Sequence, residues 1–216
     1  MIRDIVEDLL SVDDRTWALY AYRKEPLRGK VSFEDYYALH FPDALADARR
    51  MADEYAGKTV EEMEELLSLR VEMIPMRPGQ TVNDFAVFNE PDTVCVYEDN
   101  ALESQKIVDH LEDERIKVSV TDMLVSHEIF HALQSRHPDL LVNRPRVKLW
   151  KLFGYENVSR LVSLEEVAAM YFTKYFLGME AVPYVYDVIM CMSRAPGKAK
   201  ELYASIMEMK EESDGK

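Results

Sequence analysis

The amino-acid sequence predicts a mostly helical α+β protein with a small antiparallel sheet near the middle of the chain. Its 216 residues include only 7 glycines and 9 prolines, a composition typical of long regular elements joined by few elaborate loops. Apolar residues recur at helical spacing toward both ends of the chain. Between residues 69 and 98 they occur instead in short β-branched and aromatic runs, separated by turn-forming residues.

Residues 1 to 58 are expected to form an N-terminal helical region. The segment IRDIVEDLL places its apolar residues at helical spacing. Ser32 precedes a second helical run, FEDYYALHF, and Pro42 begins a third. Just beyond this region, Thr59 and Glu62 have the spacing of a capping box at the head of a further helix, VEEMEELLS.

Three strands are predicted next. LRVEMIPM (69–76), FAVF (85–88) and TVCVYE (93–98) are short and rich in β-branched or aromatic residues. The tetrapeptide NEPD between the last two is typical of a hairpin turn. We therefore expect a small antiparallel sheet.

Helical periodicity resumes near Val118 and continues almost to the end of the chain. The two cysteines, Cys95 and Cys191, stand in apolar runs and belong to no CxxC pair, so we expect buried free thiols. The helices predicted in this part of the chain cover residues 119–136, 146–153, 163–178, 182–192 and 196–211.

Charge and hydropathy exclude several classes of partner. The formal net charge of -14 argues against nucleic acid, because a phosphate backbone needs a surface of lysine and arginine. It fits a protein that engages neutral or basic polypeptide. The first residues, MIRDIVEDLLSVDD, place acids where a signal peptide needs an unbroken apolar core, and no uncharged stretch reaches the roughly 18 residues that span a bilayer. We expect a cytoplasmic protein with no membrane partner.

The stretch HEIFH carries the strongest chemical signal. His127 and His131 stand four residues apart, so on a helix both imidazoles lie on one face and can reach one metal ion. Glu128 lies beside them, where its carboxylate can take a proton from a water that the metal activates. The spacing therefore predicts two zinc ligands and a general base within about one helical turn.

The surroundings of the motif favour a metal site. Apolar residues flank HEIFH on all sides, so the helix is expected to be mostly buried, where two histidines and a glutamate are costly without a partner. The alternative is a core helix whose histidines are satisfied by hydrogen bonds. A zinc site with catalytic potential needs a third protein ligand and leaves one position for water.

Two regions offer that third ligand. His137 follows in HEIFHALQSRH, which differs from the metzincin pattern HExxHxxGxxH only at Gln134. Glycine at that position lets the helix end in a sharp turn, whereas the run ALQSR favours its continuation. Glu166, in SLEEVAAMYF, resembles the E-x-x-A pattern in which gluzincins bring a glutamate to the metal on a second helix, so it is the preferred candidate; Glu165 is the fallback. A capping box between Ser163 and Glu166 is the competing interpretation, because it would fold Glu166 away from a metal.

The order of helices, small sheet, HExxH helix and glutamate-bearing helix resembles the gluzincin metallopeptidases, most of all the compact ImmA/IrrE type. The resemblance covers roughly residues 45 to 178, and HEIFH and EVAAMYF carry it. The sequence departs from the family at Met170, where asparagine is usual, and at Thr173, where alanine is usual. It also carries extra N-terminal and C-terminal helices. We expect a zincin-like metallopeptidase core with C-terminal helices over residues 59 to 216, and one compact domain together with the N-terminal region.

The activity implied is hydrolysis of peptide bonds in a peptide or protein substrate, with Zn²⁺ held by His127, His131 and Glu166 and with Glu128 as general base. The resemblance also implies that TVCVYED is an edge strand able to bind an extended peptide. The main alternative is a non-catalytic binding or regulatory protein on a zincin scaffold with a structural metal. A third interpretation, an acidic interaction protein without metal, rests on the net charge alone.

Overall fold

The computed structural model describes residues 2–75, 85–152 and 155–215. The chain is mostly helical (67%) with a small sheet, which confirms the mostly helical α+β prediction. Among the described helices, none combines the length and apolar character needed to cross a bilayer. Both cysteines are free; Cys191 is buried, as predicted, and Cys95 is partly buried.

The α-helices are α1 (Ile2–Leu10), α2 (Asp14–Lys24), α3 (Phe33–Asp35), α4 (Phe41–Glu54), α5 (Val60–Leu67), α6 (Glu98–Leu111), α7 (Val120–Arg136), α8 (Val162–Phe176), α9 (Tyr184–Arg194) and α10 (Pro196–Asp214). The short 3₁₀ and π segments are η1 (Arg28–Lys30), η2 (Tyr36–His40), η3 (Glu114–Ile116) and η4 (Leu141–Asn143). The strands are β1 (Arg70–Ile74), β2 (Ala86–Asn89), β3 (Thr93–Tyr97), β4 (Val147–Leu152) and β5 (Tyr155–Ser159).

The first three strands form a mixed sheet in the order β1-β3-β2. The β2–β3 hairpin is antiparallel, as predicted, and NEPD forms its turn. β1 instead runs parallel to β3, so the prediction of a purely antiparallel sheet is wrong. Alternation of side chains fixes which face of a strand is buried but not its direction, and a strand outside a tight hairpin can pair either way. Among the described strands, β3 is the central strand of the sheet rather than the predicted edge, and β1 and β2 are its edges.

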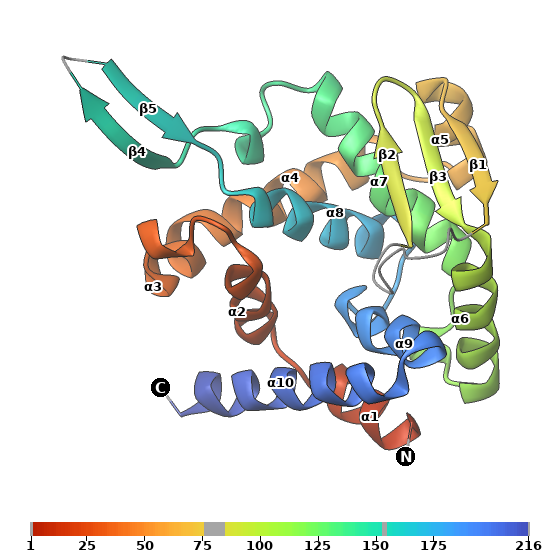
Figure 1. Ribbon diagram of the computed structural model, residues 1–216. Helices are drawn as coiled ribbons and strands as arrows, with labels where there is room; N and C mark the ends of the chain where they lie inside the picture. The colour runs from red at the N-terminus through yellow and green to blue at the C-terminus, as the bar shows by residue number, and fades with distance from the viewer. Residues whose placement is uncertain (1, 76–84, 153–154, 216) are drawn as a thin grey trace.

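Helix α7 lies at the centre of the molecule, between the sheet and α8 (Figure 1). Its apolar residues surround the helix on most sides, so it can be stable only where other elements cover it. β2 and β3 pack against it, and Val94 and Val96 of β3 are fully buried. α8 packs along α7, and α4 packs against α8. The predicted helices at 119–136, 163–178, 182–192 and 196–211 all form, each within a turn of its expected limits.

Two elements differ from prediction. Residues 146–153, predicted as a helix, contain strand β4, which pairs with β5 in a hairpin that projects from the body of the molecule (Figure 1). A register irregularity between Lys148 and Trp150 interrupts the strand alternation, so the sequence pattern does not show it. Helix α6 was not predicted, because its buried stripe includes the polar residue Ser104. Residue 76, the end of the first predicted strand, and residue 153 lie outside the described residues.

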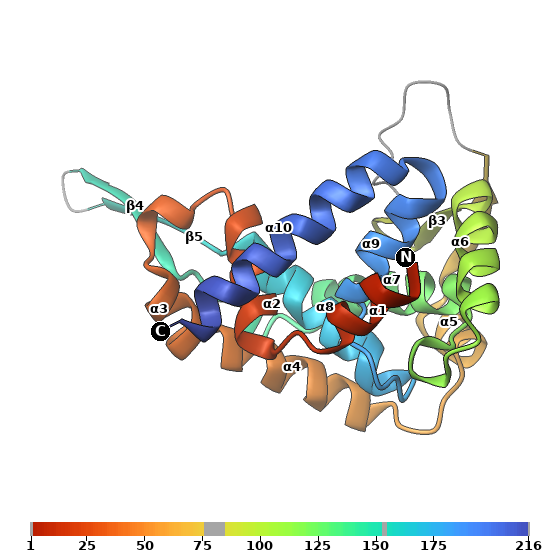
Figure 2. The same ribbon diagram turned by 90° about the horizontal axis from the view of Figure 1, so that it is seen from below.

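The N-terminal and C-terminal helices pack against one another. α10 crosses α1 and α2 and packs against α9, as Figure 2 shows from below. Trp17 of α2 stacks on Tyr184 of α9 with ring centroids 5.5 Å apart, and Tyr20 meets the same ring edge-on at 5.4 Å. α2 also packs on α8. This aromatic contact places residues from both ends of the chain next to the helix that carries Glu166.

Candidate metal centre

Helix α7 brings the two motif histidines together. Its first turn is capped by Ser119, whose hydroxyl accepts a hydrogen bond from the backbone N–H of Asp122 at 3.2 Å. One face of the helix then presents His127 and His131 toward α8, with their Nε2 atoms 3.2 Å apart. Neither imidazole is fully buried, so both rings border an accessible space.

Helix α8 supplies the carboxylate that faces them. The helix begins at Val162, and the N-cap residue Leu161 provides no side-chain hydrogen bond. Glu25, which is fully buried, takes that role instead: its Oε2 accepts hydrogen bonds from the backbone N–H of Ser163 at 2.9 Å and from the Ser163 hydroxyl at 2.8 Å. The capping box between Ser163 and Glu166 therefore does not form. Glu166 is free to face α7.

The distances among the three side chains suit a shared metal ion. Glu166 Oε2 lies 3.3 Å from His127 Nε2, and Glu166 Oε1 lies 3.5 Å from His131 Nε2. Ligands about 2.0–2.1 Å from a tetrahedral ion lie roughly 3.3–3.4 Å from one another. The observed separations, including the 3.2 Å between the two Nε2 atoms, match this spacing. His127, His131 and Glu166 could therefore hold a metal ion.

Charge coupling holds this group together without a metal. Burial alone would lower the pKa of His127, but the hydrogen bond and charge of Glu166 outweigh it and raise that pKa above its usual value. Burial would likewise raise the pKa of Glu166, yet the hydrogen bond and charge of His127 hold it well below the usual range. The Glu166 side chain is 49% exposed, so water weakens this pair. The Glu166 carboxylate is therefore ionised in this pair.

Glu128 borders the same space without joining the three-residue group. It is buried, and it lines a cavity of about 630 Å³ together with His127, His131 and Glu166. Strand β2 and helices α2, α8, α9 and α10 contribute the rest of the wall. A carboxylate on the same cavity wall, outside the ligand group, can act as a general base when a water lies within its hydrogen-bond reach.

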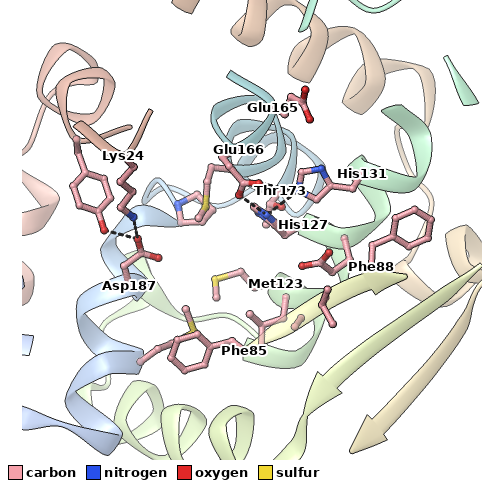
Figure 3. A pocket seen from close by; sticks show the side chains of 18 of the residues that line it. Lys24, Phe85, Phe88, Met123, His127, His131, Glu165, Glu166, Thr173 and Asp187 are labelled. Carbon is pink, nitrogen blue, oxygen red and sulfur yellow. Dashed lines mark hydrogen bonds and ion pairs between the residues drawn. The ribbon is translucent and has the colours of Figure 1, made fainter. Parts of the chain in front are cut away.

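The two other proposed ligands lie elsewhere. Glu165 is directed away from Glu166 (Figure 3) and pairs with Arg160 at 3.4 Å. His137 ends α7: its backbone N–H donates to the carbonyl of Leu133 at 2.9 Å. Within the described part of the chain, neither residue belongs to a group that could hold a metal ion. The helix does continue through Gln134 to Arg136, as the absence of glycine predicts.

Gln134 has a role that the sequence did not suggest. Its Oε1 lies 3.3 Å from Nδ1 of His131, the ring nitrogen that does not face Glu166. Its Nε2 donates to Oδ1 of Asn143 at 3.0 Å, and Nδ2 of Asn143 donates to the Gln134 carbonyl at 3.1 Å. A ligand histidine held in this way keeps its orientation and its tautomer, with Nδ1 protonated and Nε2 free for a metal. The one feature of the sequence that could have indicated this role is the glutamine itself, which stands where metzincins carry glycine.

Comparisons of the chain with protein-family models, with curated proteins and with solved structures found no match. The class of the protein must therefore be judged from its site. That site consists of two imidazoles and a carboxylate from two packed helices, a second carboxylate beside them, and one cavity that all four groups line.

Proposed function

We propose that this protein is a zinc-dependent metallopeptidase in which His127, His131 and Glu166 hold the metal and Glu128 is the general base. The single observation that carries the proposal is the spacing of the three ligand atoms, 3.2 to 3.5 Å, with Glu128 on the wall of the same cavity. Structural zinc sites are typically closed by four protein ligands, whereas catalytic sites have three and an open position. Two imidazoles and one carboxylate form a set typical of catalytic zinc.

The proposed chemistry follows from the positions of the side chains. A zinc ion at this site would supply a Lewis acid and lower the pKa of a water molecule that enters the cavity. The carboxylate of Glu128 accepts the proton of that water and donates it to the leaving amine of the cleaved peptide. His131 keeps its orientation through Gln134, and Glu166 keeps its position because Glu25 fixes the start of α8.

The proposal extends to the fold and the substrate. The order of small sheet, motif helix and glutamate-bearing helix supports a zincin-like core of the gluzincin class, most like the ImmA/IrrE type. A peptide or protein substrate fits the open cavity beside β2, an edge strand whose residues line it. An extended peptide can pair with such an edge and lie across the site.

Comparison of Glu128→Gln with the parent protein on a peptide library tests the proposal. Both proteins are expected to bind zinc, because Glu128 is not in the ligand group. Hydrolysis should fall by roughly 10²–10⁴-fold in the variant, the usual contribution of a general base. Glu103→Gln is the matched control and should retain parental activity, because Glu103 is an exposed glutamate that pairs with Lys106 and does not line the cavity.

Equal activity of Glu128→Gln and parent would exclude the role given to Glu128. Zinc binding without hydrolysis of any peptide would favour the non-catalytic alternative.

A further inference from the structure

The cavity wall opposite the metal-binding residues carries a second polar cluster. Figure 3 shows Lys24 and Asp187 on one side of the cavity and His127, His131 and Glu166 on the other. The hydroxyl of Tyr20 donates to Asp187 Oδ2 at 2.7 Å, and Nζ of Lys24 lies 3.3 Å from the same oxygen. Tyr20 and Lys24 come from α2 and Asp187 comes from α9, so helices near opposite ends of the chain form this wall.

Asp187 is the fixed member of the cluster. Its side chain is 19% exposed, and the Tyr20 ring that holds it is itself buried against Trp17 and Tyr184. Both contacts of the carboxylate go to Oδ2, and no described residue bonds Oδ1. A carboxylate kept in one place, with an oxygen left over, can accept hydrogen bonds from a ligand.

Lys24 is the adjustable member. Its side chain is 55% exposed, and its ammonium lies over the Tyr20 ring, 3.9 Å from the centroid. A lysine head on a flexible four-carbon stem can turn into solvent at little cost. Its position shows that the cavity side of Asp187 has room for an ammonium group next to an aromatic face, which is a favourable place for a cation.

Apolar side chains also line the cavity. Phe85, Met123, Met190 and Leu202 contribute to its lining. Such a surface suits the methylene stem of a long side chain, and methionines adapt to its shape. Apart from the histidines, Lys24 is the one cationic group among the described residues that line the cavity, against the four carboxylates of Glu128, Glu165, Glu166 and Asp187.

We propose that Asp187 is a specificity-determining residue that selects substrates with a lysine or arginine side chain. The ammonium or guanidinium of the substrate takes the place that Lys24 occupies beside Asp187, and its stem lies on the apolar lining. In the absence of substrate, the Lys24 ammonium thus occupies the cation-binding position beside Asp187, and it turns outward when the substrate binds. The inference rests on the proposed function, because it assigns a substrate class to the same cavity. The net charge of -14 favours the approach of such basic peptides.

Binding to a positional-scanning peptide library tests the assignment separately from catalysis. Zinc-loaded protein in a Glu128→Gln background is titrated with fluorescent peptides that carry lysine, arginine, norleucine or glutamate at the scanned position. We expect tighter binding of the lysine and arginine peptides at one position. Asp187→Asn should reduce that preference roughly tenfold or more, the effect of losing a charge-assisted hydrogen bond. Lys24→Gln should strengthen binding of the basic peptides, because it removes the competing cation.

Two further variants serve as a second test of Asp187 and as a control. Tyr20→Phe retains the aromatic ring but removes the hydrogen bond to Asp187, so it should weaken the preference even if Asp187→Asn folds poorly. Asp139→Asn, an exposed aspartate paired with Arg50, is the matched control and should leave the preference unchanged.

The outcomes separate the two proposals. A preference for basic peptides that disappears in Asp187→Asn supports the assignment even if the parent hydrolyses none of them, a result that would overturn the peptidase proposal alone. Hydrolysis by the parent with no preference for lysine or arginine, or with one that Asp187→Asn retains, would overturn the assignment alone. A preference for glutamate that Lys24→Gln abolishes would also overturn it, because the recognising group would then be Lys24.

Discussion

The orientation of His131 depends on a single glutamine. Gln134 is buried one turn further along α7, and its amide connects Nδ1 of His131 to Asn143. Arg160 also donates to Oδ1 of Asn143 at 3.0 Å, so the amide network continues to the loop before α8. Outer partners of this kind commonly contribute 10–100-fold to metal affinity, because they fix the ring and increase its basicity.

Replacement of Gln134 should therefore weaken the site without removing a ligand. We expect Gln134→Ala to reduce zinc affinity by roughly 10–100-fold, measured by competition with a chromophoric chelator. Ser135→Ala is the control, because Ser135 is exposed and its hydroxyl bonds only the Ala132 carbonyl of its own helix. Equal affinities of the two variants would show that Gln134 does not orient His131.

At the scale of elements, the start of α8 decides where Glu166 lies. Glu25 follows directly after α2, and its carboxylate spans two chain segments: Oε1 accepts from the backbone N–H of Leu27 at 2.9 Å, and Oε2 accepts from Ser163. The same contact fixes the end of α2, where Lys24 faces the cavity. A capping carboxylate at a helix N-terminus is also favoured by the helix dipole.

Loss of this carboxylate should destabilise the protein. Glu25→Ala leaves the buried donors of Ser163 and the partly buried N–H of Leu27 without their acceptor, so we expect the free energy of unfolding in urea to fall by roughly 1–3 kcal/mol. Glu34→Ala removes an exposed glutamate paired with Arg15 and should change it little. A change no larger for Glu25→Ala than for Glu34→Ala would contradict the capping role.

The helices and strands differ in how well they can be predicted from local sequence. α7, α8, α9 and α10 have long apolar periodicity, and their limits were predicted within a turn. β4 was predicted as a helix, because its bulge conceals the alternation of a strand. The parallel pairing of β1 with β3 depends on the path of the chain between strands and not on any residue pattern within them.

At the scale of the whole molecule, the residues of one cavity wall could be predicted from the sequence, whereas those of the opposite wall could not. His127, His131 and Glu166 lie on α7 and α8, and the spacing of the motif and of the next acidic helix indicated all three. Asp187 meets Tyr20 across 167 positions of sequence, and Glu25 meets Ser163 across 138. Such contacts form only when segments far apart in the sequence pack together, and no local pattern encodes them.

The zinc content of purified protein tests the central claim most directly. Elemental analysis of protein prepared without chelator or nickel resin should find about one zinc per chain, the number that one three-ligand site holds. Glu166→Ala should lose most of this zinc, whereas His137→Ala should retain it, because His137 ends α7 outside the ligand group. A parent protein that binds no zinc even after its addition, or a Glu166→Ala variant that retains a full equivalent, would contradict the account.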